Sequence, residues 1–207
     1  MLKQSGFDVW SEEYDEYVKK CSGEYPFDGY YAVLDYVYCK VENKKSRILD
    51  VGIGTGLLAN RLYKDGAVIY GMDFSQKMIQ ISGEKMPEAI LLQWDFNSGL
   101  PSEFKTEKFD YIISTYAIHH LNDDKKVEFI EKLSASLNKD GKIIIADISF
   151  LTAEKLNECK GKNAGKWDYD EFYIAADKFI DKLKLPGFKV LYTQISSCAG
   201  VLELSPG

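Results

Sequence analysis

Residues 48–58 read Ile-Leu-Asp-Val-Gly-Ile-Gly-Thr-Gly-Leu-Leu, and this stretch decides the fold of the chain. An apolar run reaches an acid, Asp50, and three glycines follow at alternate positions, Gly52, Gly54 and Gly56. Apolar residues at helical spacing begin directly after them. Glycine suits backbone that bends sharply or lets a ligand approach without a Cβ in the way. The pattern predicts a strand, a tight turn and a helix whose free N–H groups face a ligand.

The spacing of this turn differs from two phosphate-binding patterns. The dinucleotide fingerprint is Gly-x-Gly-x-x-Gly, but here Leu57 takes its last position and the third glycine comes one residue early. The P-loop pattern is missing too, because no Lys follows Gly56. The carboxylate of Asp50 would repel a pyrophosphate, whereas it could hold a positive amino group through a charge-assisted bond. The turn therefore favours a cationic ligand without phosphate.

The composition favours one globular domain. The chain has 207 residues, of which 45% are hydrophobic, and this suffices for one domain with a core. The net charge of −6 and the lack of a long basic run argue against a nucleic-acid partner. The first residues lack the apolar centre of a signal peptide, and no apolar run reaches the roughly 18 residues of a membrane span. These features predict a cytoplasmic protein with no membrane partner.

The cysteines and histidines give no metal-binding pattern. No pair among the four cysteines forms Cys-x-x-Cys, and the two histidines are adjacent to each other. The spacing therefore predicts no metal site and reduced, partly buried thiols.

Strands and helices alternate along most of the chain. Helices are predicted at about 8–21, 28–42, 56–64, 76–85 and 122–138, and strands at about 47–51, 67–72, 89–94, 109–115 and 142–148. Ser75, and Asn122 or Asp123, suit helix N-caps, and Asp140-Gly141 is expected to end the last of these helices. Nearly all-apolar strands between helices are typical of an α/β protein with a parallel sheet covered on both faces.

The last quarter of the chain follows a different pattern. Residues 152–184 are polar and helical in pattern, with an interruption around Gly161 to Gly165. Phe188 to Ser196 and Val201 to Leu204 lie close enough in sequence for a hairpin, so the last two strands should be antiparallel.

Five segments in order resemble the motifs of class I S-adenosylmethionine-dependent methyltransferases, over about residues 30–205. They are residues 49–56, 70–75, 94–96, 109–114 and 141–147. Residues 114–124 are similar to small bacterial methyltransferases of unassigned substrate. The resemblance implies a Rossmann-like, doubly wound, mostly parallel seven-stranded sheet with an antiparallel last strand. It also implies a single domain over 1–207, in which 1–45 and 152–184 form helical covers, 46–151 the cofactor-binding core and 185–207 a C-terminal hairpin.

The resemblance implies a binding site for S-adenosylmethionine. Its amino group would lie at Asp50, its ribose hydroxyls at Asp73 and its adenine amino group at Asp95. The full set implied is Asp50, Gly52, Ile53, Gly54, Gly56, Asp73, Phe74, Met78, Asp95, Phe96, Ser114 and Thr115. Purely structural interpretations compete at several of these positions. Asp73 could cap a helix, although Ser75 already suits that position. Asp95 could be a solvated loop acid, and core packing would equally explain Phe74 and Met78.

Two further groups are candidates for the reaction itself. His119 and His120 follow the fourth strand, and the pKa of histidine suits a general base near neutral pH. One of the two could instead be structural, and a thiolate or carboxylate nucleophile would need no base. Trp10, Tyr14 and Tyr116 are expected to shield the methyl group and shape the acceptor pocket, although aromatic residues at helical spacing are more often core.

The function that these residues and the resemblance imply is methyl transfer to a small-molecule acceptor by in-line displacement, with release of S-adenosylhomocysteine. Ser-Thr-Tyr-Ala at 114–117 replaces the Asp/Asn-Pro-Pro-aromatic motif of amino-methylating DNA enzymes. Short cover segments without a second domain favour a small acceptor. A non-catalytic S-adenosylmethionine-binding protein and a nicotinamide-dependent oxidoreductase remain the alternatives. The sequence does not decide between a monomer and a homodimer.

Overall fold

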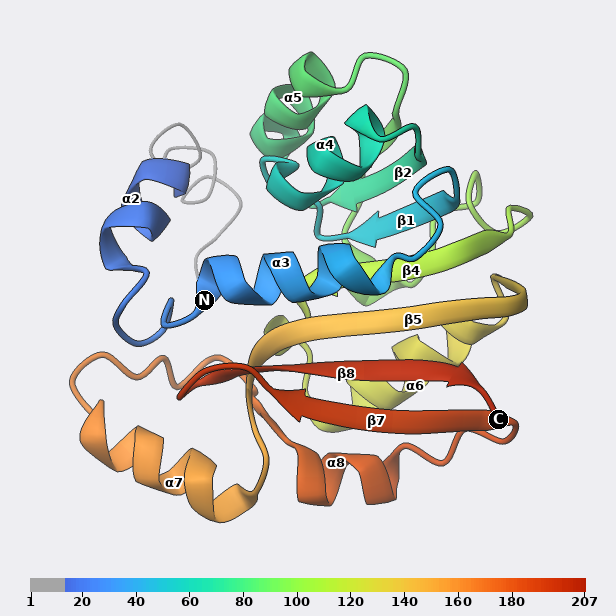
Figure 1. The fold of residues 1–207 in the computed structure, drawn as a ribbon. Helices are drawn as coiled ribbons and strands as arrows, with labels where there is room; N and C mark the ends of the chain where they lie inside the picture. The colour runs from blue at the N-terminus through green and yellow to red at the C-terminus, as the bar shows by residue number, and fades with distance from the viewer. Residues whose placement is uncertain (1–13) are drawn as a thin grey trace.

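The computed structural model describes residues 14–207 and shows a twisted sheet with helices on both faces (Figure 1). The main strand order is β3-β2-β1-β4-β5-β8-β7, and β6 pairs with β5 off this path. The strands are β1 Arg47–Val51, β2 Val68–Asp73, β3 Ile90–Gln93, β4 Phe109–Thr115, β5 Leu137–Phe150, β6 Ile174–Ala175, β7 Phe188–Gln194 and β8 Ala199–Pro206. The first five are parallel, whereas β8 runs antiparallel to both β5 and β7. The expected doubly wound sheet with a reversed last strand is confirmed.

The described part of the chain contains seven helices, some of which cover the two faces of the sheet. They are α2 Tyr14–Cys21, α3 Tyr30–Lys40, α4 Leu57–Lys64, α5 Gln76–Lys85, α6 Asp123–Ser134, α7 Ala153–Lys162 and α8 Ala176–Lys182, with short 3-10 turns η1 Phe96–Ser98 and η2 Ile118–His120. One buried cluster joins α3 and α4 to the sheet, and another joins α6 and α8 to the opposite face. Neighbouring strand residues such as Ile112 and Ile113 enter different clusters because successive side chains of a strand point to opposite faces.

Two helices begin at the positions that local signals indicate. The Oγ atom of Ser75 accepts a hydrogen bond from the Met78 N–H at 3.2 Å and begins α5. Asn122 caps α6 in the same way, since its Oδ1 accepts from the Lys125 N–H at 3.0 Å. Both N-cap predictions are confirmed.

The prediction that α6 continues to about residue 138 and ends at Asp140-Gly141 is wrong. It relied on the rule that a helix commonly ends just before a glycine. The helix ends at Ser134, and β5 already begins at Leu137, which pairs with Phe109. The Phe109 N–H donates to the Ser136 carbonyl at 2.9 Å, so pairing with the sheet replaces the last helical turn. Gly141 then lies within the strand, where a Cβ would stand 2.9 Å from the Phe109 carbonyl oxygen.

The segment 152–184 contains the expected helices and one element that the sequence did not indicate. The helices α7 and α8 flank a loop of residues 163–173, and the short strand β6 follows that loop. Strand β6 pairs in parallel with the end of β5, at Ser149 and Phe150. This pairing brings the loop across the carboxyl end of the sheet. Within residues 14–207, no helix is both long and apolar enough to cross a membrane.

Candidate active site

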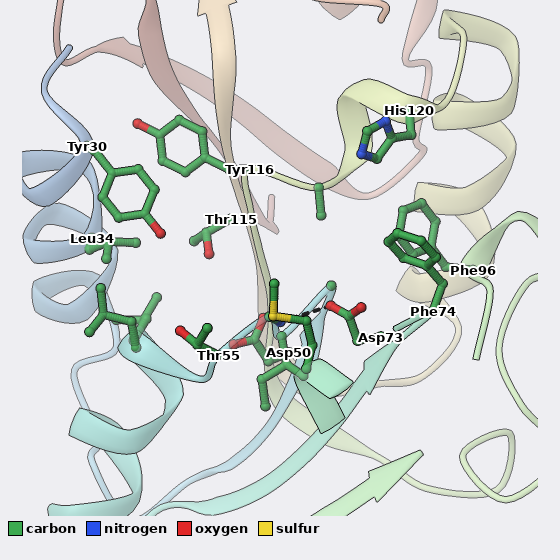
Figure 2. Close-up of a pocket in the computed structure, with 17 residues that line it drawn as sticks. Tyr30, Leu34, Asp50, Thr55, Asp73, Phe74, Phe96, Thr115, Tyr116 and His120 are labelled. Carbon is green, nitrogen blue, oxygen red and sulfur yellow. Dashed lines mark hydrogen bonds between the residues drawn. The ribbon is translucent and has the colours of Figure 1, made fainter. Parts of the chain in front are cut away.

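A pocket lies at the carboxyl ends of β1, β2 and β4, where ligands of open α/β sheets bind (Figure 2). Its walls come from the glycine turn, from α3 and from the residues that follow β2 and β4. The lining residues are Tyr30, Leu34, Asp50, Gly52, Ile53, Gly54, Thr55, Leu57, Leu58, Asp73, Phe74, Met78, Phe96, Thr115, Tyr116, Ala117 and His120. Most residues that the sequence singled out for a ligand therefore meet in one place.

The turn after β1 needs its glycines for two different reasons. Gly52 has a φ of 73°, and a Cβ there would lie 2.3 Å from the Ala117 Cβ. Gly56, also at 73°, stands outside the pocket, and its Cβ would lie 2.8 Å from the Met86 Cε. The first position keeps the floor of the pocket open, whereas the second lets α4 and α5 pack closely.

Asp50 lies near the end of β1 and lines the pocket with a buried side chain. The residue is 2% exposed, and its Oδ1 has no hydrogen-bond partner among the described residues. Burial, together with the nearby carboxylate of Asp73, raises the pKa of Asp50 to about 8. A buried carboxylate is costly without a partner, so this position favours a proton or a cationic group facing Oδ1.

Asp73 connects the end of β2 to the glycine turn. Its Oδ2 accepts from the Gly54 N–H and its Oδ1 from the Ser75 N–H, each at 2.9 Å. These bonds hold the carboxylate at the pocket wall, and Figure 2 shows Asp73 there with its bond to the glycine turn. The Asp73 side chain thus joins the glycine turn to the residues before α5, and Ser75 is the N-cap of that helix.

The remaining candidates for cofactor binding divide into two groups. Phe74, Met78, Phe96 and Thr115 line the pocket together with Ile53.

Asp95 and Ser114 do not line it. Asp95 is exposed and begins η1, where its Oδ1 accepts from the Asn97 N–H at 2.9 Å. The Ser114 Oγ donates to the Val51 carbonyl at 2.8 Å and joins β4 to β1.

A second cavity of about 450 Å³ adjoins the first, on the side of the 163–173 loop. Its wall combines aromatic, acidic and imidazole side chains: Tyr17, Cys21, Glu24, Tyr25, Pro26, Phe27, Tyr116, His119, His120, Ile148, Lys166, Asp168, Glu171 and Tyr173. Tyr116 and His120 line both cavities. Tyr116 has a φ of 52°, which is rare for a residue with a side chain, and its ring stacks on Tyr30 at 4.6 Å. The two cavities meet at these residues.

The two histidines have different surroundings although they are adjacent. His119 is buried, and its Nδ1 lies 2.7 Å from the Asp147 Oδ1. Burial by itself would lower the pKa of His119, but the carboxylates of Asp147 and Glu171 raise it above its ordinary value. Burial and the neighbouring His119 lower the pKa of His120 to about 4, so His120 is neutral at pH 7.

A buried lysine holds the 163–173 loop against the histidine turn. The Lys126 Nζ donates to the carbonyls of Leu121 and Phe172, each at 2.6 Å. The Phe172 N–H in turn donates to the His119 carbonyl at 2.8 Å. Residue 171 is thereby fixed beside the histidines.

Sequence reasoning missed four of the residues that shape this region: Asp147, Lys126, Glu171 and Thr55. An acid inside the apolar run of residues 143–148 was the available signal for Asp147. No local pattern marks Lys126 or Glu171, because both act on segments far away in sequence.

The N-terminal cover is described only in part. Helix α2 contacts the glycine turn, since the Thr55 Oγ1 donates to the Asp15 Oδ1 at 2.8 Å. Trp10 lies outside the described residues, and Tyr14 is described only as the first residue of α2. Their expected role at the methyl group therefore stays a prediction.

Comparison with known proteins gives consistent matches along the chain. A family model described as a methyltransferase domain matches residues 48–141. An uncharacterized methyltransferase of Anoxybacillus flavithermus is 32% identical over 206 residues, covering 95% of this chain and 94% of that protein. One of Geobacillus thermodenitrificans is 32% identical over 207 residues with the same coverage.

Solved structures share the fold at lower identity. DhpI, in its complex with SAH, has a TM-score of 0.72 at 17% identity and covers 99% of this chain and 95% of its own. Magnesium protoporphyrin IX methyltransferase from Synechocystis, with bound SAH, has a TM-score of 0.63 at 19% identity and covers 86% and 84%.

Proposed function

The chain belongs to the class I S-adenosylmethionine-dependent methyltransferases, and from this premise we propose that it methylates a small molecule held in the second cavity. The observation that carries the proposal is the buried Asp50 beside an open glycine turn. Its Oδ1 lacks a partner within the described chain, and the cofactor has an ammonium group that could supply one.

The lining of the first pocket fits the other parts of the cofactor. The backbone of Gly52 and Gly54 would carry the methionine part, and Asp73 would accept the ribose hydroxyls. Phe74 and Met78 would pack on the adenine ring, with Phe96 nearby. Asp95 does not line the pocket and caps η1 through its Oδ1, so a bond to the adenine amino group would require this carboxylate to move toward the pocket.

The second cavity supports a small acceptor. Its volume of about 450 Å³ falls within the range of small-molecule sites. Because Tyr116 and His120 belong to both walls, we assign the transfer to their position. When bound, the cofactor supplies an electrophilic methyl group and its own leaving group. The residues of the chain then need mainly to align the acceptor and exclude water, which can contribute roughly 7–11 kcal/mol.

The histidines are proposed to handle the proton of the acceptor. Asp147 fixes the His119 ring so that its Nε2 faces the second cavity, where Glu171 also lies. Transfer to an acceptor with a hydroxyl or amine group releases a proton, and a fixed imidazole near the acceptor can take it.

Two measurements test the proposal. Titration calorimetry should show binding of S-adenosylmethionine and S-adenosylhomocysteine and no binding of NAD, whereas the reverse would identify an oxidoreductase. Incubation with S-adenosylmethionine carrying a labelled methyl group and fractionated metabolites should then label a small molecule. Tight cofactor binding without labelling over a broad panel would instead favour a non-catalytic binding protein.

A further inference from the structure

Three side chains of types that can bind metal ions lie close together on the wall of the second cavity. His119, His120 and Glu171 each offer one ligand atom, and these atoms lie within 4.8 Å of one another. The His119 Nε2 lies 3.6 Å from the Glu171 Oε1. This separation exceeds the roughly 2.7–3.2 Å of an N–H···O hydrogen bond. It is close to the ~3.3 Å between two ligands that each stand about 2.0–2.1 Å from one tetrahedral ion.

The residues behind these ligands have the arrangement that supports a metal site. Asp147 accepts from the His119 ring at Nδ1 and from the His119 backbone N–H at 3.0 Å, which turns Nε2 toward the cavity. On the opposite side, the Tyr173 hydroxyl donates to the Glu171 Oε2 at 2.6 Å and leaves Oε1 facing His119. Metal-binding histidines and carboxylates are commonly oriented by such partners.

We propose that His119, His120 and Glu171 bind one divalent ion of the zinc or cobalt type, and that this ion holds an oxygen atom of the methyl acceptor. Two imidazoles and one carboxylate suit such ions, whereas magnesium prefers oxygen ligands alone. Three protein ligands leave the fourth position of a tetrahedral ion open, and the second cavity has room for an acceptor there. The spacing of the sequence gave no sign of this site, because Glu171 is brought to the histidine pair by the fold.

The second part of the inference rests on the proposed function. With both imidazoles bound to the ion, the ion takes the place of the imidazole base described above, because an acceptor hydroxyl bound to the ion would lose its proton to solvent more readily. The bond from the sulfonium sulfur to the methyl group then breaks, the oxygen–carbon bond forms, and the electron pair stays on sulfur. The acceptor class is therefore an oxygen nucleophile such as a hydroxyl or hydroxy-acid group.

The test measures metal binding with no cofactor or acceptor present. Chelator-treated protein is titrated with zinc, cobalt and magnesium chloride by calorimetry. We expect one equivalent of zinc or cobalt, no comparable magnesium binding and a cobalt spectrum without thiolate charge-transfer bands. Glu171→Gln and His120→Ala should weaken zinc binding by at least about 100-fold, and Asp147→Asn by about 10–100-fold.

Glu24→Gln is the matched control, because Glu24 lines the same cavity outside the cluster and should leave zinc binding unchanged. Circular dichroism and the thermal unfolding transition of each variant report intact folding. Absence of saturable uptake, or uptake unchanged in both Glu171→Gln and His120→Ala, would overturn the metal site. Uptake abolished by Cys21→Ser would overturn it as well. Methyl transfer without metal uptake would leave the proposed function standing, and metal uptake without any cofactor binding would leave only the metal site.

Discussion

At the scale of single residues, Asp50 combines burial with a carboxylate oxygen that has no hydrogen-bond partner within residues 14–207. Its surroundings raise the pKa to about 8, so the carboxyl group is mostly protonated at pH 7 when no ligand is bound. An ammonium group at Oδ1 would stabilise the charged form and lower that pKa. Ligand binding and proton release are therefore coupled at this residue.

We expect the protein to release a proton from Asp50 when it binds S-adenosylhomocysteine at pH 7. Calorimetry in buffers of different ionisation enthalpy measures this release. Asp50→Asn should abolish it and weaken binding about 10–100-fold, since a charged hydrogen bond contributes about 1.5–3 kcal/mol. Wild-type affinity in the Asn variant would show that Asp50 does not contact the ligand.

The same residue predicts a pH dependence of stability. Because the folded-state pKa lies above the unfolded value of 3.8, the folded protein binds more protons between these two values. The free energy of unfolding of the ligand-free protein should therefore fall as pH rises from about 4 to about 8, relative to Asp50→Asn. Urea unfolding of both proteins across this range measures the difference, and parallel pH profiles would contradict the prediction.

At the scale of elements, α6 positions the loop that closes the second cavity. Lys126 projects from α6 and binds the carbonyls of Leu121 and Phe172, so one ammonium group joins the histidine turn to the 163–173 loop. Its side chain is fully buried, and burial lowers the pKa of Lys126. The three hydrogen-bond donors of an ammonium group are what make this connection possible.

Replacing Lys126 by Met should destabilise the protein by about 1–3 kcal/mol, because the carbonyls of Leu121 and Phe172 lose their donor. It should also reduce methyl transfer more than cofactor binding, since the loop borders the second cavity rather than the first pocket. Denaturant unfolding measures the loss of stability, and calorimetry with the cofactor beside transfer of a labelled methyl group measures the second effect. Lys125→Met, on the exposed face of the same helix, is the control and should change neither. Equal stability of the two variants would contradict the role of Lys126.

At the scale of the whole molecule, two cavities that are lined by different parts of the chain adjoin each other. The first pocket is formed mainly at the carboxyl ends of β1, β2 and β4, and the second cavity mainly by α2, the loop after it and the 163–173 loop. Tyr116 and His120 form their shared wall. A ligand that binds the first pocket of the folded protein and not the unfolded chain should therefore stabilise the fold.

S-adenosylhomocysteine at 100 times its dissociation constant should add about 2.7 kcal/mol of stability, which corresponds to a rise in Tm of about 5–10 °C for a domain of this size. Differential scanning calorimetry measures this rise. NAD at the same concentration should give no shift. A shift with NAD alone would contradict the assignment of the pocket.

Local signals in the sequence determined most of the fold and most of the lining of the first pocket. The glycine turn at 52–56, the alternation of strands and helices and the cap at Ser75 each depend on residues that are neighbours in sequence, and all three appear in the structure. Hydrophobic periodicity, capping and glycine backbone freedom act over a few residues. These three signals can therefore be identified from a single sequence.

Only the tertiary structure decided where α6 ends and what surrounds the histidines. Asp147 lies 28 residues from His119, and Phe172 lies 46 residues from Lys126. Such contacts arise because β5 pairs with β4 and β6 pairs with the end of β5, which carries the 163–173 loop to the histidine turn. Sheet pairing and packing over long separations outweigh local preference, so no pattern within a few residues of His119 could indicate its partners.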